Sequence, residues 1–160
     1  MAGSRAVISI RAADARDAAA IEAIERASFA RQDERFSLRR ILFLMRNQRS
    51  GVLVAERDRT VVGWAAGFVW LRGQIPWGRV YAVATDGQAR GAGVGRRLTE
   101  RVIEMLAARG AERMFLEVRP DNAAAIALYR KLGFQECRAL PDYYGRGVPA
   151  VRMVHYVHGA

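Results

Sequence analysis

The sequence predicts an α/β fold in which a six- to seven-stranded mixed sheet is flanked by about four helices. Its 160 residues, 51% of them hydrophobic, are the size of one compact domain with a sizeable core. Some segments alternate apolar and polar residues, as strands do, whereas others repeat apolar residues every three or four positions, as helices do. No repeat, low-complexity stretch or linker divides the chain, so we expect a single domain over residues 1–160.

The first half predicts one strand, two helices and a hairpin. Residues 7–11 alternate as in a first strand, and Asp14 is a suitable cap for the helix that follows. Ser37 precedes a second apolar stripe with helical spacing. Residues 52–56 and 60–71 have the pattern of two strands joined by a tight turn, and they predict a hairpin.

The second half alternates strands and helices. The stretch from Gly73 to Gly78 is expected to interrupt the strand pattern. The elements predicted after it are a strand over 79–85, a helix over 94–109, a strand over 114–118, a helix from Asp121 or Asn122 to Leu132, and strands over 134–140 and 148–157. The resulting order, β-α-α-β-β-β-α-β-α-β-β, indicates a mixed sheet with helices on its faces.

The charge balance points to a negatively charged partner. There are 26 basic and 16 acidic residues, for a net charge of +10, and 25 of the basic residues are arginine. We attribute the excess of arginine over lysine to a GC-rich genome, but codon usage does not explain the net charge. An acidic peptide, a phosphorylated cofactor or a nucleic acid would each suit that charge.

Several classes of protein are excluded or disfavoured. Residues 61–71, the longest nearly uncharged stretch, are too short to span a bilayer, and the N-terminus lacks a secretory signal, so a cytoplasmic address is expected. Cys137 is the only cysteine, which excludes an internal disulfide, and we expect it to be a small buried hydrophobe. His155 and His158 lie near the C-terminus without an obvious third ligand, so no metal is expected.

A glycine-rich segment between a strand and a helix is the sharpest motif. Arg90-Gly91-Ala92-Gly93-Val94-Gly95-Arg96 places several backbone N–H groups and a helix N-terminus together, which suits an anion. Its G-x-G-x-G spacing differs from the dinucleotide G-x-G-x-x-G fingerprint, and the Gly-Lys-Ser/Thr of a Walker loop is absent. A plain glycine-rich turn is the alternative.

Further motifs give a resemblance to a known family. They are Val83-Ala84-Thr85-Asp86, Arg90-x-x-Gly93-x-Gly95, Leu116-Glu117-Val118-Arg119, and Asn122 to Tyr129 followed by Leu132-Gly133-Phe134. Together they resemble the GNAT acetyltransferase superfamily, and the later block is similar to its ribosomal-protein-alanine N-acetyltransferase (RimI-like) branch. The resemblance runs over residues 79–144, and the order of the preceding elements also fits that fold.

The resemblance implies acetyl-CoA as the co-substrate, with no metal. The implied cofactor-binding residues are Val83, Thr85, Arg90, Gly91, Gly93, Gly95, Arg96 and Asn122. The glycine-rich loop would hold the pyrophosphate, and the strand before it would pair with the pantetheine arm. Parallel strands that splay apart would make room for that arm.

The same resemblance implies roles for four further residues. Glu117 matches the general base and Tyr129 the general acid, while Tyr143 and Tyr144 match a tyrosine pair that lines the acceptor groove. These roles suit the attack of a neutral amine on a thioester, and an α-amine, with a pKa near 8, needs less help than a lysine.

Each of these residues also has a plainer interpretation. Glu117 would pair with Arg119 or be solvated, Tyr129 would belong to the core, and Tyr143 and Tyr144 would be surface residues of a turn. Among the tryptophans, we expect Trp64 and Trp70 to pack on the sheet, and we leave Trp77 open as a contact for cofactor or acceptor.

The leading hypothesis is an acetyl-CoA-dependent N-acetyltransferase of a protein or peptide N-terminus, possibly of a ribosomal protein. Residues 145–150 and 28–36 depart from the RimI-like pattern, which has acidic residues in the first segment, so an acidic or neutral N-terminus suits this chain better. A small-molecule amine or a lysine side chain is the alternative acceptor. A nucleic-acid-binding module is disfavoured because the arginines are scattered, and a monomer or dimer is expected.

Overall fold

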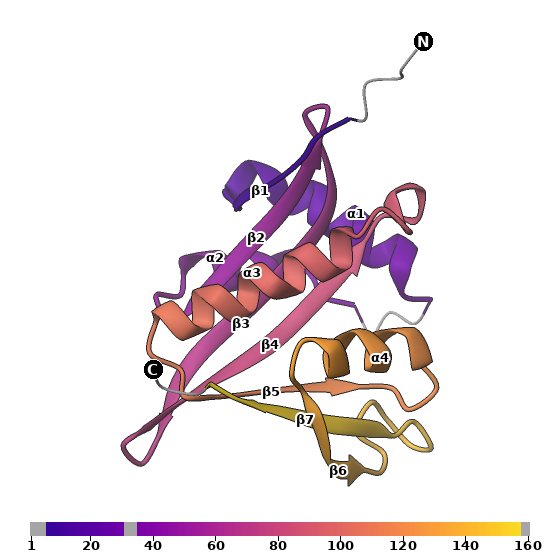
Figure 1. The fold of residues 1–160 in the computed structure, drawn as a ribbon. Helices are drawn as coiled ribbons and strands as arrows, with labels where there is room; N and C mark the ends of the chain where they lie inside the picture. Colours follow the sequence, from indigo (N-terminus) through magenta and orange to yellow (C-terminus); the bar gives the residue numbers. More distant parts are fainter. Residues whose placement is uncertain (1–5, 31–34, 158–160) are drawn as a thin grey trace. The chain divides into compact units, whose positions relative to one another are not determined.

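The structure is a computed structural model that describes residues 6–30 and 35–157 (Figure 1). The order of its helices and strands is the one predicted from the sequence. The elements are β1 (Ile8–Ala12), the 3-10 turn η1 (Ala15–Asp17), α1 (Ala18–Ser28), α2 (Leu38–Arg46), β2 (Ser50–Arg57), β3 (Thr60–Arg72), β4 (Ile75–Thr85), η3 (Gly87–Ala89), α3 (Val94–Ala108), β5 (Arg113–Val118), α4 (Ala123–Lys131), β6 (Gln135–Leu140) and β7 (Ala150–Tyr156).

The strands form one seven-stranded mixed sheet in the order β1-β2-β3-β4-β5-β7-β6, which confirms the predicted fold class. The pair β4–β5 is parallel, whereas β1–β2, β5–β7 and β6–β7 are antiparallel. Within the described residues, no helix is long and apolar enough to cross a membrane.

The chain divides into two compact units, and β3, β4 and α3 contribute to both. The N-terminal unit comprises the chain up to Ala66 together with Ala82–Val102, and the C-terminal unit comprises Gly67–Tyr81 together with the chain from Ile103 onward. A single domain over residues 1–160 stays a prediction.

The N-terminal unit is built around Trp64 of β3, which is fully buried. Its indole Nε1–H donates to a carboxylate oxygen of the buried Glu25 of α1 at 3.0 Å, and the other oxygen accepts from the backbone N–H of Phe36 at 2.9 Å. These two bonds hold α1 against β3 and fix the segment before α2. A Cβ at Gly63 would lie 3.0 Å from side chains of Val94 and Leu98, so glycine lets α3 approach β3 closely.

Helix starts in this unit use the caps expected from the sequence. The Asp14 carboxylate accepts from the backbone N–H of Arg16, and the Asp17 carboxylate accepts from the backbone N–H of Asp14, which forms a capping box at η1. Ser37 accepts from the backbone N–H of Arg40 at the start of α2. The 3-10 turn η1, which leads into α1, and the helix α2 therefore begin where a polar side chain replaces the missing backbone acceptor.

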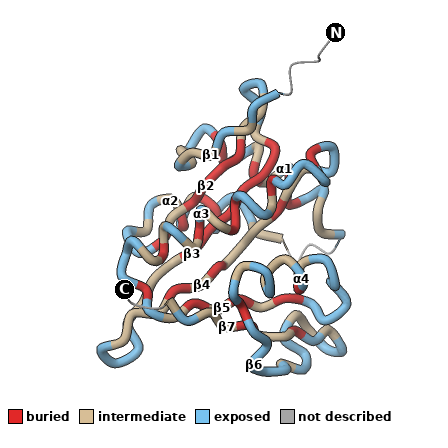
Figure 2. Tube along the Cα trace, in the orientation of Figure 1, coloured by how far each residue is buried: buried red, intermediate tan, exposed pale blue. Residues whose placement is uncertain are grey.

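The C-terminal unit is organised by the alternation of β5. Met114, Leu116 and Val118 are buried and alternate along the strand, so they share one face. Figure 2 shows buried segments along β5. The opposite face presents Phe115 and Glu117, each half-buried as a residue. Side chains that carry chemistry and side chains that form the core therefore alternate along one short strand.

Two sequence expectations are wrong. β4 begins at Ile75 rather than at residue 79, so the interruption expected from Gly73 to Gly78 shrinks to a turn before Ile75. Gly78 serves packing instead, because a Cβ there would lie 3.1 Å from the Cβ of Ala111. Cys137 is exposed rather than buried, since it lies on the edge strand β6, of which five of the six residues are exposed; it is also the extra residue of a β-bulge.

Candidate active site

The glycine-rich loop is anchored by Asp86 in the N-terminal unit. The backbone N–H of Asp86 donates to the carbonyl of Val62 at 2.8 Å, and its carboxylate accepts from the backbone N–H of Gln88 at 3.0 Å. Beyond η3 the chain passes through positive φ at Gly91 (81°) and Gly93 (75°) before α3 begins. Those angles favour glycine, so the spacing of the motif follows from the path of the backbone.

This loop leaves the first amides of α3 without helical partners. The backbone N–H of Arg97 donates to Gly93 at 3.1 Å, and the amides that precede it lie before the first complete turn. No atom lies within 4 Å of a Cβ built on Gly91 or Gly93, so the space above the loop is open. Exposed amides at a helix N-terminus form a site for an anion such as a phosphate.

The arginines of the loop differ in their partners. Arg96 pairs with Glu100 at 3.1 Å one turn along α3, and Arg97 donates to the carbonyl of Ile8 at 2.8 Å. Arg90 is exposed, and its side chain makes no hydrogen bond or ion pair with another described residue. Arg90 is therefore the loop arginine most available to an anion. Val83 and Thr85, on the strand before the loop, are half-buried.

Glu117 is held by two arginines in the C-terminal unit. One carboxylate oxygen accepts from Nε and Nη2 of Arg79 on β4, at 3.1 and 2.8 Å. The other accepts from Nε and Nη2 of Arg152 on β7, at 3.1 and 3.0 Å. The Glu117 side chain is only 3% exposed. Two forked arginine contacts of this kind are strong and directional, so they fix the orientation of the carboxylate.

The tyrosine pair joins the same group of side chains. Arg79 Nη2 donates to the Tyr143 hydroxyl at 2.5 Å, and the rings of Tyr143 and Tyr144 pack edge to face with centroids 4.9 Å apart. Burial, reinforced by Tyr143 and by the charge of Glu117, raises the pKa of Tyr144 to about 12. The structure therefore brings Glu117 and both predicted acceptor-groove tyrosines together.

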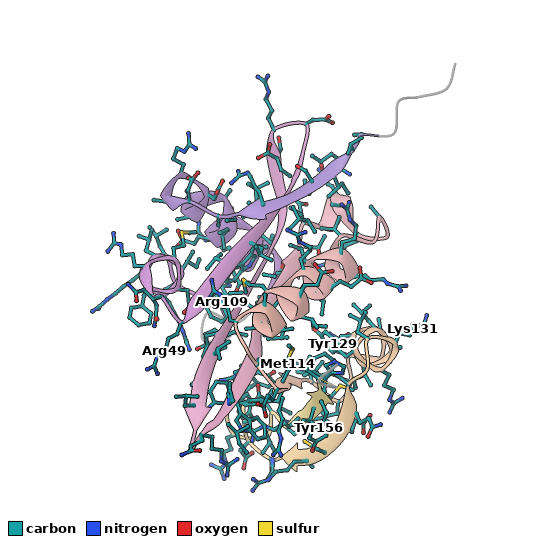
Figure 3. All side chains as sticks on the ribbon, turned by 60° about the vertical axis from the view of Figure 1, so that its left-hand side comes forward. Arg49, Arg109, Met114, Tyr129, Lys131 and Tyr156 are labelled. Carbon is teal, nitrogen blue, oxygen red and sulfur yellow. The ribbon has the colours of Figure 1, made fainter. Side chains whose placement is uncertain are left out.

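Tyr129 lies near the end of α4 (Figure 3), with its ring packed edge to face on Phe134 at 6.1 Å. Burial raises the pKa of Tyr129 to about 12. Within the described part of the chain its hydroxyl has no hydrogen-bond partner. Asn122 caps α4 by accepting from the backbone N–H of Ala125 at 3.1 Å, so its side chain has a structural role at the position predicted to contact the cofactor.

The parallel strands β4 and β5 are paired over only three positions. The pairs are Trp77 with Arg113, Gly78 with Met114 and Arg79 with Phe115. Glu117 lies two residues beyond Phe115, the last of the three paired residues of β5.

Sequence reasoning missed both arginines that hold Glu117, and only the plainer interpretation of this residue named a partner, Arg119. Arg119 binds Asp121 at 3.3 Å, in the turn before α4. Arg79 and Arg152 come from distant strands, and only the register of the sheet places Arg152 directly opposite Glu117. One signal in the sequence was available. Arg79 follows Trp77 by two positions and Glu117 follows Phe115 by two positions, so each charged residue lies on the same face of its strand as an aromatic residue.

The remaining predicted residues have structural surroundings. Trp70 packs on Phe115 at 5.2 Å and on Trp77 at 6.3 Å, and the Trp77 indole nitrogen is buried without a hydrogen-bond partner. His155 faces the Gly133 carbonyl at 3.0 Å, and His158 lies outside the described residues. Across residues 6–30 and 35–157, no group of three or more His, Cys, Asp or Glu side chains could hold a metal ion.

Comparison with known proteins identifies the class to which this loop and fold belong. Residues 16–134 match the acetyltransferase (GNAT) family, which is most of the chain. The chain therefore belongs to the acetyltransferase (GNAT) family, and the resemblance predicted from its motifs is confirmed.

Particular relatives carry different names. The chain is 36% identical over 119 residues to mycothiol acetyltransferase from Amycolatopsis mediterranei, covering 69% of this chain and 37% of that protein. It is 45% identical over 65 residues to [ribosomal protein bS18]-alanine N-acetyltransferase from Escherichia coli, covering 41% of this chain and 44% of that protein. It therefore spans less than half the length of each of these two relatives.

Solved structures share the fold over nearly the whole chain. The structure of yncA from Salmonella typhimurium, determined with its cofactor acetyl-CoA, matches with a TM-score of 0.78 and 26% identity. The match covers 96% of this chain and 95% of that one.

Proposed function

We propose that the protein is an acetyl-CoA-dependent N-acetyltransferase that transfers an acetyl group to a primary amine, foremost the α-amine of a protein or peptide N-terminus. The observation that carries this proposal is the anion-binding geometry of the loop at residues 90–96 in a chain of the GNAT family. Transfer would proceed by direct attack of the amine while both substrates are bound.

The residues of the loop fit the phosphates of acetyl-CoA. The backbone at Gly91, Gly93 and Gly95 and the side chains of Arg90 and Arg96 would bind the pyrophosphate, because the space beside Gly91 and Gly93 is open and the first amides of α3 have no helical partners. Val83, Thr85 and Asn122 would contact the remainder of the molecule. When bound, acetyl-CoA supplies the thioester that donates the acetyl group.

Glu117 and Tyr129 would divide the proton transfers between them. The ammonium group of the acceptor must lose a proton before its nitrogen can attack, and the carboxylate of Glu117 would accept that proton, directly or through a water molecule. The leaving thiolate must gain a proton, and the Tyr129 hydroxyl would donate it. A hydroxyl with a pKa of about 12 is fully protonated at neutral pH and is therefore ready to donate.

A small-molecule amine is the second candidate acceptor. The similarity to mycothiol acetyltransferase over 119 residues favours it, because that relative is named for a small molecule. The two candidates share the cofactor, the base and the acid, and they differ in whether a peptide chain occupies the region of Tyr143 and Tyr144.

The test is the release of CoA thiol from acetyl-CoA with a panel of peptides that have free or blocked α-amines, alongside small amines and a lysine-containing peptide whose N-terminus is blocked. Turnover that requires a free α-amine supports N-terminal acetylation. Turnover confined to small amines or to lysine moves the chain to the alternative acceptor. Absence of turnover with every acceptor, from protein that binds acetyl-CoA, contradicts the proposed function.

A further inference from the structure

The charges around Glu117 do not balance. Its single carboxylate lies between the two guanidinium groups of Arg79 and Arg152, which leaves one positive charge in excess. Within the described residues neither arginine contacts a second carboxylate. Their other partners are neutral: the Tyr143 hydroxyl, and the aromatic faces of Tyr81 and Phe115.

Both arginines keep unused donors that a ligand can reach. Each binds Glu117 through Nε and Nη2 only, so the Nη1 groups have no partner among the described residues. The side chains of Arg79 and Arg152 are 22% and 32% exposed, whereas that of Glu117 is 3% exposed. An incoming group would therefore meet guanidinium edges before it met the carboxylate.

The loop that carries the tyrosine pair is neutral overall. Its acidic residue, Asp142, accepts from the backbone N–H of Gly147 at 2.5 Å. Arg146, which is also exposed, offsets the charge of Asp142. The excess positive charge beside Tyr143 therefore comes from Arg79 and Arg152.

We propose that the acceptor is a peptide whose N-terminal residue is acidic, and that Arg79 and Arg152 bind the carboxylate of that side chain. This inference rests on the proposed function and specifies its substrate. A planar carboxylate matches the forked donors of arginine and would neutralise the excess charge, whereas a basic first residue would be repelled.

The proposed contact also relieves the difficulty that Glu117 has as a base. Both carboxylate oxygens of Glu117 accept hydrogen bonds from arginine. A substrate amine must therefore compete with these arginines for Glu117. A substrate carboxylate that shares the guanidinium of Arg79 would weaken its hold on Glu117. The substrate ammonium would then pass one proton to Glu117, and the nitrogen lone pair would form the bond to the acetyl carbon. The C–S bond would break as Tyr129 protonates the sulfur, and the second proton that leaves the nitrogen would restore the Tyr129 hydroxyl.

The first experiment compares peptides that differ in one group at the first residue. Peptides beginning with Glu and Gln, and with Asp and Asn, have similar shape but differ in charge. We expect kcat/KM to be about tenfold or more higher for each acidic peptide, which corresponds to about 1.4 kcal/mol or more of transition-state stabilisation. Equal values for the two members of each pair overturn the inference and leave the acetyltransferase activity in place.

The second experiment tests the arginines. In Arg79→Gln the ratio of kcat/KM for the Glu peptide to that for the Gln peptide should fall to near one, because the guanidinium that binds the acidic side chain is gone. Damage that was only structural would lower both values alike and leave the ratio unchanged. Arg113→Gln is the matched control: Arg113 lies on the neighbouring strand over Trp77 and Tyr156 and does not contact Glu117. An unchanged ratio in Arg79→Gln, with normal acetyl-CoA binding, overturns the assignment.

A binding measurement separates this inference from the proposed function. Fluorescence anisotropy of peptides labelled at the C-terminus, with CoA present, reports binding whether or not transfer occurs. Selective binding of the Glu peptide that Arg79→Gln abolishes supports the arginine site even if no acetyl group is transferred. Free glutamate and aspartate form a further arm, and preference for them over acidic peptides contradicts a peptide acceptor.

Discussion

Tyr129 combines a hydroxyl without a hydrogen-bond partner in the described residues and a pKa raised by burial to about 12. We predict that Tyr129→Phe lowers kcat by about 100-fold, the usual contribution of a general acid, while leaving the free energy of unfolding at neutral pH nearly unchanged. Steady-state kinetics and thermal unfolding at pH 7.5 check this. Tyr156→Phe, at an exposed tyrosine of β7, is the control, and equal rates for both variants would contradict the role of Tyr129.

The raised pKa of Tyr129 also predicts how the free energy of unfolding changes at high pH. Because the folded pKa is above the unfolded value of about 10, the folded state holds its proton to higher pH than the unfolded state does. Stability from this group is complete below pH 10 and is lost as the pH rises from 10 to 12. Tyr129→Phe should therefore show a shallower decline of the free energy of unfolding in that window.

Glu117 is predicted to matter for folding as well as for catalysis. Glu117→Ala leaves Arg79 and Arg152 facing each other without a counter-charge, and we expect it to lower the free energy of unfolding by about 2–4 kcal/mol. Glu117→Gln keeps one oxygen acceptor and should cost less stability but still lose most of kcat. Denaturant unfolding and CoA release together test this, and full activity in a folded Glu117→Gln would remove Glu117 as the base.

At the residue scale, sequence reasoning predicted Glu117 and Tyr143 but not the contacts that connect them. The plainer interpretation of Glu117 named Arg119, its close neighbour in sequence, whereas the two arginines that hold its carboxylate are 38 and 35 residues away. Such pairs depend on strand register, which a periodicity of two leaves undetermined. The residue types of the site could therefore be predicted, and its electrostatics could not.

At the scale of elements, the glycine-rich loop makes the sharpest prediction. Gly93 has a φ of 75° with open space around its Cβ position. A side chain there would strain the backbone but would not clash with other residues of the protein. Gly93→Val should lower acetyl-CoA affinity by about tenfold or more, whereas Gly93→Asn, which tolerates this φ, should lose less. Calorimetric titration with acetyl-CoA measures both.

The control for that prediction is a glycine with the same conformation elsewhere. Gly73, in the turn between β3 and β4, has a φ of 64° and equally open surroundings. Gly73→Val should cost a similar amount of stability, about 1 kcal/mol or more, without changing acetyl-CoA affinity. Equal affinity losses for Gly73→Val and Gly93→Val would show that the effect is one of global stability.

The contact between α1 and β3 predicts a second measurable effect at this scale. Burial raises the pKa of Glu25, and this effect is larger than the lowering of the pKa by the hydrogen bonds from Phe36 and Trp64. A folded pKa above the unfolded value means that stability is greatest below about pH 4.5 and is lost as the pH rises through the folded pKa. Relative to wild type, Glu25→Gln should therefore gain stability as the pH rises from 4 toward neutrality.

The comparison for Glu25 is a carboxylate on the same helix. Glu22 is paired with Arg26 at 3.2 Å one turn along α1, on the solvent side. Urea unfolding at several pH values should give a profile for Glu22→Gln that runs parallel to wild type, unlike that of Glu25→Gln. Parallel profiles for both variants would contradict the role assigned to burial.

Elements with strong local signals were predicted well, and those set by tertiary contacts were not. The caps Asp14 and Ser37 and the alternation of β5 are properties of a few consecutive residues, so they can be read from the sequence. Gly78, which was expected to interrupt the strand, packs within β4 against Ala111, and the bulge at Cys137 depends on pairing with β7. Neither contact leaves a mark in the local pattern.

At the scale of the whole molecule, the net charge of +10 should act on substrate encounter. Long-range attraction between a basic protein and an acidic peptide is screened by salt, since the Debye length shrinks from about 10 Å at 0.1 M to about 3 Å at 1 M ionic strength. We predict that kcat/KM for an acidic N-terminal peptide falls several-fold over that range, while the value for a basic peptide rises and that for a neutral peptide changes little.

The salt dependence also separates the overall charge from the local arginine contacts. Arg79→Gln removes one of 26 basic residues, so it should lower kcat/KM for the acidic peptide at every salt concentration while leaving the slope nearly as in wild type. A variant with several exposed arginines of α2 replaced, such as Arg39, Arg46 and neighbouring Arg49, should instead flatten the slope. If Arg79→Gln alone abolished the salt dependence, the effect would belong to the site beside Glu117 and the net charge would have no part in choosing the acceptor.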